Sequence, residues 1–287
     1  MRRALAAFVA ILLLAGAPDA RGTGLDALVD AAAAYVRDYQ QQLTAIIADE
    51  TYTQQLRAQT PLDKGMARTR TLISEIFFMF TPGHDWMAIR DVMSMDGRPV
   101  SDRPDLRSAL QSLAAHDVAR RFKAYNSRYN LGRIVRNFNE PTLSLLVLDD
   151  AHRSRFRFER SRTQRQGGEE LVTLSFRETR GPTLVRQLNG GPAYARGEVT
   201  IEPSTGRVTR AVLALVIDPV KLTLTTTYAP DARLGIWVPA RFGEWYEHGR
   251  APRKDARTLP SGDAHEEIVC EAKYSNFRRF EVKASIR

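Results

Sequence analysis

The sequence predicts an α+β protein whose curved, mainly antiparallel sheet, a half-barrel, packs against a few helices. Three observations lead to this prediction. Apolar residues recur at helical spacing from Leu25 onward and again in one region near the middle of the chain. From His152 onward the sequence is almost entirely strand-like, with short turns that favour an antiparallel meander. Helical and strand segments do not alternate regularly, which argues against a parallel α/β fold.

The N-terminal part predicts one helix and three strands. Apolar residues recur at helical spacing from Leu25 to Ile47 and predict the first helix over 25–47. Extended segments are expected over 51–56, 70–80 and 86–95, with turns at 61–65, 81–83 and 96–99 between and after them. These segments supply the first strands of the sheet.

A helical region separates these strands from the rest of the sheet. Leu106, Leu110, Leu113, Val118 and Phe122 lie on one side of a helix predicted over 106–125. A loop rich in Asn and Arg follows over 126–140. Pro141 can open a short helix over 142–148, because proline is tolerated in a first helical turn. We therefore expect a helical insertion at about 102–150.

The C-terminal part predicts a series of strands joined by tight turns. They are expected over 155–159, 171–176, 197–202, 207–217, 222–228, 237–247 and 266–282. Gly167-Gly168 and the segment 203–206 provide hairpin turns. The segment 250–262 is rich in Pro, Arg and Asp and predicts a mobile loop.

The first 22 residues have the order of a secretory signal peptide. Arg2 and Arg3 precede an uncharged apolar run over 5–14, and small residues follow up to Gly22. This run is shorter than the roughly 20 apolar residues that span a bilayer. Small residues would allow cleavage near Ala17 or near Gly22, and an uncleaved N-terminal anchor is the alternative. We expect residues 1–22 to be removed and 23–287 to form one domain without a transmembrane anchor.

Composition places the protein in the bacterial envelope. Cys270 is the only cysteine, so no internal disulfide forms, which is common for exported bacterial proteins. It also lies far from the signal segment and cannot carry a lipoprotein anchor there. The formal net charge is +9, and removal of residues 1–22 takes away three Arg and one Asp, which leaves about +7. We expect a periplasmic or secreted protein that favours anionic surfaces such as lipid headgroups, and no nucleic-acid partner.

Three segments resemble the bacterial lipoprotein carriers of the LolA/LolB-like fold. They are the strand-turn-strand element over 197–208, the segment Trp237-Val238-Pro239 leading to Glu244 and Tyr246, and Tyr274-Ser275-Asn276-Phe277. The resemblance covers about residues 193–282 and the opening helix and strands. It implies a half-open barrel with helices against its concave side. The segment 102–150 is additional, and its stretch Tyr125–Gly132 has no counterpart in the carriers.

The residues that commonly carry catalysis do not form a recognisable pattern. No Gly-x-Ser-x-Gly elbow is present. His265-Glu266 begins like a zinc-protease helix, but Val269 occupies the position of the second metal-binding histidine. Asp149, Asp150 and His152 could bind a cation or serve acid–base chemistry, but a helix end followed by a polar loop is the simpler explanation. We expect no enzyme activity, no metal and no other cofactor, and a buried structural role for Cys270.

A basic segment is the candidate for anion contact. Arg153, Arg155 and Arg157 alternate with Phe156 and Phe158, which predicts a strand with one charged and one aromatic face. Guanidinium groups bind carboxylate or phosphate through paired hydrogen bonds. A solvated outer face of the sheet is the alternative.

Apolar strand faces are the candidates for ligand binding. A half-barrel has a concave apolar face that either is filled by helices or leaves room for an acyl chain. If a cargo binds, we expect it to contact Phe78, Phe80, Leu222, Leu224, Trp237 and Trp245. Trp237 and Trp245 share strand parity, so we expect them to lie on the same face of the sheet. The sequence thus predicts a non-catalytic carrier for a lipid, acyl chain or lipoprotein. The alternative is a structural or protein-interaction module of the envelope, with an envelope protein as its partner.

Overall fold

The computed structural model describes residues 24–59, 67–81, 86–134, 136, 140–249 and 265–280. The expected signal peptide over 1–22 and the expected mobile loop over 250–262 lie outside the described residues. The helical segments are α1 (Leu25–Gln42), α2 (Leu106–Ser112) and α3 (Ala115–Asn126), with the short 3-10 helices η1 (Ser127–Tyr129), η2 (Leu143–Leu148) and η3 (Arg153–Arg155).

The strands of the described chain are β1 (Ile46–Gln59), β2 (Ala67–Phe80), β3 (Trp86–Met95), β4 (Arg98–Pro99), β5 (Phe156–Gln166), β6 (Glu169–Glu178), β7 (Val185–Arg186), β8 (Pro192–Ala193), β9 (Arg196–Ile201), β10 (Val208–Ile217), β11 (Val220–Asp231), β12 (Ile236–His248) and β13 (His265–Arg279). Each predicted extended segment corresponds to a strand, although β1 and β5 are about twice as long as predicted and the short strands β4, β7 and β8 were not predicted.

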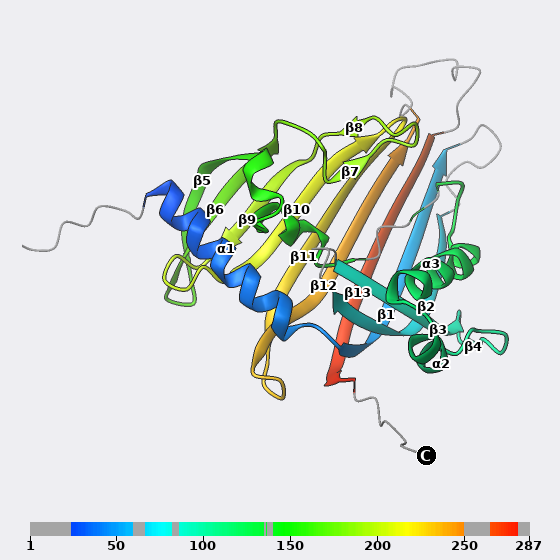
Figure 1. Ribbon diagram of the computed structural model, residues 1–287. Helices are drawn as coiled ribbons and strands as arrows, with labels where there is room; N and C mark the ends of the chain where they lie inside the picture. Colours follow the sequence, from blue (N-terminus) through cyan, green and yellow to red (C-terminus); the bar gives the residue numbers. More distant parts are fainter. Residues whose placement is uncertain are drawn as a thin grey trace, which may run out of the picture.

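Eleven strands of the described chain form one antiparallel sheet (Figure 1). Their order is β4-β3-β2-β1-β13-β12-β11-β10-β9-β6-β5, and β7 and β8 form a separate two-stranded ribbon. The last strand β13 pairs with both β1 and β12, so it joins the N-terminal strands to the C-terminal meander. The edge strands β4 and β5 do not pair with each other, so the sheet curves without closing. The predicted α+β half-barrel is confirmed.

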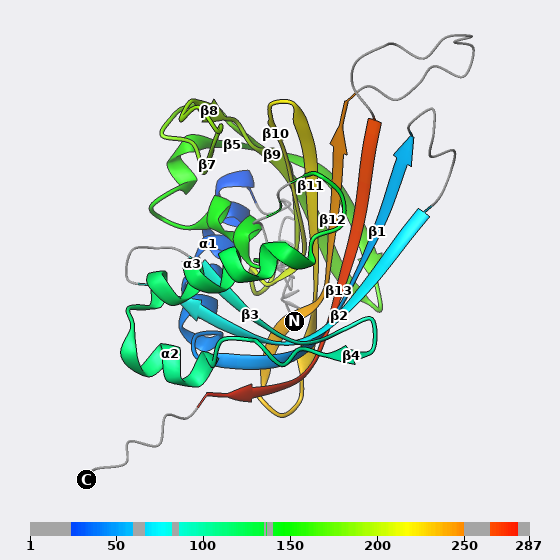
Figure 2. The same cartoon turned by 90° about the vertical axis from the view of Figure 1, so that its right-hand side faces the viewer.

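Helix α1 lies within the curve of the sheet (Figure 2), and together with η2 it fills the concave face. Helices α2 and α3 pack against the opposite side of β3. Leu28, Ala32 and Val36 of α1 are fully buried and enter the same core as the inward side chains of the strands. All six residues of η2 are buried in this face as well. The turn between β9 and β10 meets α1 so closely that a Cβ at Gly206 would overlap the backbone of Ala31.

The first helix is shorter than its periodicity predicted. Helix α1 ends at Gln42 and β1 begins at Ile46, so the prediction of a helix to Ile47 is wrong at its C-terminal end. Ala45 takes a positive φ of 57° between the two elements. Ile46 and Ile47 pair with Phe78 and Phe77 of β2. Pairing of β-branched residues with aromatic neighbours in the sheet therefore outweighs the apolar spacing that continued the helix.

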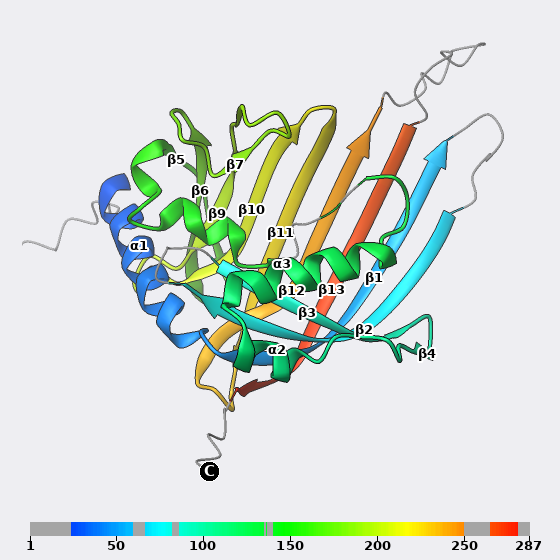
Figure 3. The ribbon, with the colours of Figure 1, turned by 45° about the vertical axis from the view of Figure 1, so that its right-hand side comes forward.

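The predicted helix over 106–125 consists of two helices. Asp105 caps α2, since its Oδ1 accepts from the Ser108 N–H at 3.1 Å. The chain is extended at Leu113 and Ala114, and α3 then begins. Val118 and Phe122 of α3 pack in a second core cluster against the outer side of β3, and Figure 3 shows both helices in front of this strand. The break lets two short helices cover one strand.

Candidate functional site

Most residues that we expected to line a ligand site are part of the packed core. Phe78 and Leu224 are fully buried. The ring of Phe78 contacts those of Tyr274 and Phe277, at centroid distances of 5.9 Å and 6.4 Å. Phe80 is half-buried and meets Trp86 edge-on at 5.1 Å. Since helices fill the concave face, these side chains pack against protein.

Trp237 and Trp245 lie in different surroundings. The indole N–H of Trp245 donates to Glu267 Oε1 at 2.8 Å, on the face of β12 opposite the buried Glu244. Trp237 packs at the edge of the main core, with the guanidinium of Arg207 at 4.2 Å from its ring centroid. A register shift between β11 and β12 separates the two positions. Shared strand parity therefore does not bring them to one face, and this expectation is wrong.

Leu222 lies at a cavity, which we call the mouth cavity. It has a volume of about 510 Å³ and lies where the turn between β10 and β11 meets the end of β12, the start of β13 and the ribbon β7–β8. Its lining residues are Arg133, Ile134, Arg186, Leu188, Ile217, Asp218, Pro219, Val220, Leu222, Tyr246, His248 and Glu266. This volume is in the range of small-molecule sites in proteins.

The mouth cavity has apolar walls and charged groups among its lining. Ile217, Val220 and Leu222 come from the β10–β11 hairpin, and Leu188 comes from the ribbon. Leu188 is 92% exposed, which is unusual for a side chain of its size. Gln187 holds the ribbon to the hairpin, because its Nε2 donates to Val216 O at 3.0 Å and its Oε1 accepts from Asp218 N at 2.9 Å.

One wall of the mouth cavity is fixed by the buried carboxylate of Glu266. Its Oε1 accepts from the backbone N–H groups of Arg133 and Ile134, at 2.8 Å and 3.2 Å. Gly132, just before them, has a positive φ of 78°, and a Cβ at this position would overlap Glu266 Oε1. Only glycine combines this backbone conformation with so close an approach. The segment is thereby held against β13.

A buried polar cluster lies behind Tyr246 of the mouth cavity. The Tyr246 hydroxyl donates to Glu244 Oε2, and the guanidinium of Arg136 lies 5.9 Å from the Tyr246 ring centroid. Arg136 also donates to Gln54 Oε1 and to Leu131 O, the latter at 2.7 Å. Burial raises the pKa of Glu244 above its ordinary value, opposed by the hydrogen bond from Tyr246.

Next to this cluster, Glu50 and Arg90 form a buried ion pair. Arg90 Nε donates to Glu50 Oε2 at 2.5 Å and Nη2 donates to Oε1 at 2.7 Å. Burial alone would lower the pKa of Arg90, but the charge and hydrogen bonds of Glu50 outweigh it and raise this pKa. The guanidinium also lies 4.1 Å from the ring centroid of Tyr52. Both charges therefore remain compensated inside the half-barrel.

The three expected anion-contacting arginines do not share a strand face. Arg153 and Arg155 belong to η3, and β5 begins only at Phe156, so this part of the prediction is wrong. Backbone hydrogen bonds from Arg153 and Arg155 to Asp149 and His152 carbonyls hold this segment in turns instead. Arg153 pairs with Asp30 at 2.5 Å, while Arg157 of β5 is exposed and pairs with Glu159 at 3.5 Å.

Three further observations concern metal binding, the cysteine and the membrane. Within them, no group of three or more His, Cys, Asp or Glu side chains could hold a metal ion. Cys270 is buried, and burial raises its pKa to about 12. No helix of the described chain is long and apolar enough to cross a membrane.

Sequence reasoning missed several residues that shape this region. Glu50 and Gln54 occupy the inward register of β1, between Ala48, Tyr52 and Leu56, which are also buried. Polar residues in an otherwise apolar inward register are a signal that the sequence contained. Arg133, Arg186 and Glu266 meet only through the tertiary fold and gave no such signal.

Comparison with known proteins yields distant structural likenesses. No protein-family model and no curated protein matches the sequence. A domain from Vibrio parahaemolyticus, provisionally assigned as an outer membrane lipoprotein-sorting protein, is 10% identical with a TM-score of 0.38, over 90% of this chain and 95% of that one. A DUF1329 family protein from Desulfovibrio piger is 13% identical with a TM-score of 0.36, over 91% and 94%.

A third similar structure is lipovitellin, described in terms of its lipid–protein interactions. It is 8% identical with a TM-score of 0.30, over 85% of this chain and 26% of lipovitellin. Each of these TM-scores is below 0.5, so the function proposed for this chain rests on its own geometry. The curved, unclosed sheet with α1 and η2 against its concave face has the half-barrel architecture that the resemblance to the lipoprotein carriers implied.

Proposed function

We propose that this protein is a non-catalytic carrier that binds the acyl chain of a lipid or lipoprotein in the mouth cavity. The observation that carries the proposal is a cavity of about 510 Å³ with mainly apolar walls at one end of the half-barrel. Burial of alkyl groups would provide the affinity, at about 0.8 kcal/mol per methylene. The signal-like N-terminus favours action in the bacterial envelope or outside the cell.

The arrangement of the mouth cavity supports an amphiphilic ligand. Ile217, Val220 and Leu222 offer apolar contacts, and Arg133 and Arg186 are exposed to solvent beside them. An acyl chain could therefore lie against the hairpin while its polar head stays in water. The charges of Asp218 and Glu266 balance the two arginines, so the cavity itself does not select an anionic head.

A chain-length series tests this proposal. A fluorescent fatty-acid probe would be displaced by alkyl ligands of increasing length, and affinity should rise by up to about fourfold per added methylene until the cavity is full. Val220→Asp places a charge on the cavity wall and should weaken binding by at least about tenfold. Circular dichroism and urea unfolding would confirm that the variant folds.

Val216→Asp is the matched control. Val216 lies in the same hairpin and is 47% exposed, but it does not line the cavity. The control should bind the probe as the wild type does. An affinity that is independent of chain length, or equal losses in the two variants, would overturn the proposal.

The filled concave face favours a second candidate, an interaction module of the envelope. Helix α1 and η2 occupy the face that a large cargo would need. In addition, the edge strand β5 is exposed along most of its length, so it offers unpaired backbone groups to a partner. If the wild-type protein binds no acyl probe but captures a specific envelope protein through β5, this candidate replaces the carrier.

A further inference from the structure

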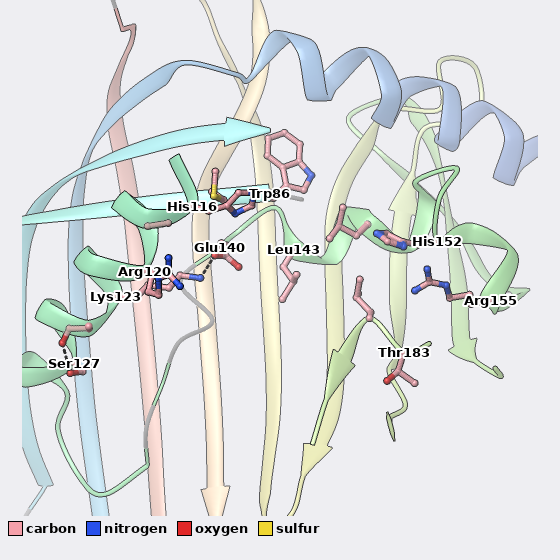
Figure 4. Close-up of a pocket in the computed structure, with 15 residues that line it drawn as sticks. Trp86, His116, Arg120, Lys123, Ser127, Glu140, Leu143, His152, Arg155 and Thr183 are labelled. Atoms are coloured by element: carbon pink, nitrogen blue, oxygen red, sulfur yellow. Dashed lines mark hydrogen bonds and ion pairs between the residues drawn. The ribbon is translucent and has the colours of Figure 1, made fainter. Parts of the chain in front are cut away.

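A second cavity lies between α3, η2 and η3, and we call it the helical cavity (Figure 4). Its volume is about 700 Å³. Residues from each of these elements face the same space: Arg120 and Lys123 from α3, Leu143 and Leu146 from η2, Arg155 from η3, and His152, which directly precedes η3. Helix α3 and η2 lie within the segment 102–150, which is additional to the lipoprotein carriers, and η3 follows this segment directly.

Arg155 is held in place by backbone groups and not by a carboxylate. Its Nη1 donates to Pro182 O at 2.7 Å and its Nη2 donates to Ala151 O at 3.3 Å. Among the described residues, no acidic side chain forms an ion pair with it. The guanidinium has five N–H donors, so donors remain for a ligand. A fixed and uncompensated guanidinium is pre-organised to bind an oxyanion through paired hydrogen bonds.

The rest of the helical cavity combines positive charge with an apolar floor. The lining includes three cationic side chains, those of Arg120, Lys123 and Arg155. Lys123 pairs with Glu140 and Arg120 pairs with Asp117, so the excess positive charge is that of Arg155. In Figure 4, Arg155 lies on one side of Leu143, and the Lys123–Glu140 pair lies on the other. Leu143, Leu146 and Trp86 provide apolar surface. An excess of one sign of charge in a concave site attracts the opposite charge.

We propose that the helical cavity binds an organic oxyanion, a carboxylate or phosphate attached to an apolar body. The oxyanion would accept hydrogen bonds from Arg155, and the apolar body would lie over Leu143 and Leu146. This site is separate from the mouth cavity and does not depend on the proposed carrier function. Of the three expected anion-contacting arginines, the structure leaves this role to Arg155.

Calorimetric titration with phenyl phosphate tests the proposal on the full chain. The wild type should bind phenyl phosphate and phenylacetate, with affinity that falls as NaCl is added. Inorganic phosphate alone should bind at least about tenfold more weakly, because it gains nothing from the apolar floor. Arg155→Met should weaken phenyl phosphate binding by at least about tenfold, the loss expected for a charge-assisted hydrogen-bonded contact.

Three variants make this result specific. Arg157→Met removes a charge from the adjacent strand, where Arg157 is exposed. Arg180→Met loosens the same segment, since Arg180 Nε donates to Ser154 O at 3.0 Å, but it leaves Arg155 in place. Both should bind phenyl phosphate like the wild type. Val220→Asp, which alters the mouth cavity, should do the same.

Several outcomes would overturn this proposal. They are no phenyl phosphate binding by the wild type, equal affinity for inorganic and phenyl phosphate, or unchanged affinity in Arg155→Met. An equal loss in Arg180→Met would show that the segment's anchoring, and not the guanidinium of Arg155, sets the affinity. A loss in Val220→Asp alone would place the oxyanion in the mouth cavity. None of these results decides whether the mouth cavity binds an acyl chain, which the chain-length series tests separately.

Discussion

Replacing Arg90 with methionine should destabilise the protein more than any loss of a surface charge. Arg90 of β3 and Glu50 of β1 have side chains that are 4% and 0% exposed, and two hydrogen bonds of 2.5 Å and 2.7 Å join them. Arg90→Met leaves the Glu50 carboxylate in the core without its counter-charge. Breaking a buried pair from one side costs about 3–5 kcal/mol.

The measurement is the free energy of unfolding in urea at pH 7, followed by tryptophan fluorescence. Because domains of this kind are stable by only about 5–15 kcal/mol, the expected loss is a large fraction of the total. The double variant Glu50→Leu with Arg90→Met removes both charges and should recover most of that loss. Arg241→Met is the control, since its pair with Glu271 has side chains 64% and 46% exposed, and it should cost at most about 1 kcal/mol.

Two results would refute this reasoning. Equal losses in Arg90→Met and Arg241→Met would show that burial of the ion pair has no energetic consequence. A double variant that is less stable than Arg90→Met would show that the Glu50 carboxylate is not the source of the loss.

Three further predictions concern buried groups and one close approach. Because burial raises the pKa of Cys270 to about 12, an aromatic disulfide reagent at pH 8 should label the native protein at least about 100-fold more slowly than the unfolded chain. The pKa of Glu244 is raised by burial, so its contribution to stability is present below its unfolded pKa and is lost as pH rises through the folded value. Glu244→Gln should therefore raise the unfolding free energy at pH 7 and reduce its decline as pH rises above about 4.3, the ordinary pKa of glutamate, in urea titrations. Gly132→Ala should cost about 1–2 kcal/mol from backbone strain plus the overlap with Glu266, and should weaken acyl-probe binding in the mouth cavity.

Each of these predictions has its own contradicting result. Rapid labelling of Cys270 in the folded protein would show that the thiol is accessible. A Glu244→Gln variant less stable than the wild type at pH 7 would show that the charged carboxylate is favoured there. Gly97 is the control for Gly132, since it has the same φ of 78° and nothing within 4 Å of an added Cβ. Equal losses in Gly97→Ala and Gly132→Ala would mean that the contact with Glu266 is unimportant.

The fold could be predicted because its strands alternate clearly and its turns are short. The strand over 86–95 has the bounds expected from the sequence. The end of α1 could not be predicted, because Ile46 and Ile47 continue the helical spacing and only their pairing with β2 decides their conformation. Likewise, alternation of Arg and Phe over 153–158 does not reveal that backbone bonds to Asp149 and His152 begin the segment with a 3-10 turn.

The candidate site was less predictable than the fold. An apolar strand residue can pack against protein or line a cavity, and its sequence neighbourhood is the same in both cases. Leu222 lines the mouth cavity, whereas Leu224, which lies two residues further along the same face of β11, is fully buried in the core. The difference depends on how far α1 and η2 fill the concave face, which is a property of the whole fold. The oxyanion site at Arg155 depends in the same way on elements far apart in the sequence.

Photo-crosslinking tests the central claim, acyl-chain binding in the mouth cavity, most directly. A fatty acid with a diazirine near the end of its chain would be bound to the full protein and irradiated, and the labelled residues would be identified by mass spectrometry. We predict labels on the β10–β11 hairpin and the end of β12, among Ile217, Val220, Leu222 and Tyr246, and their loss in Val220→Asp. Labels spread over the exposed surface, or labelling that Val220→Asp leaves unchanged, would contradict the account.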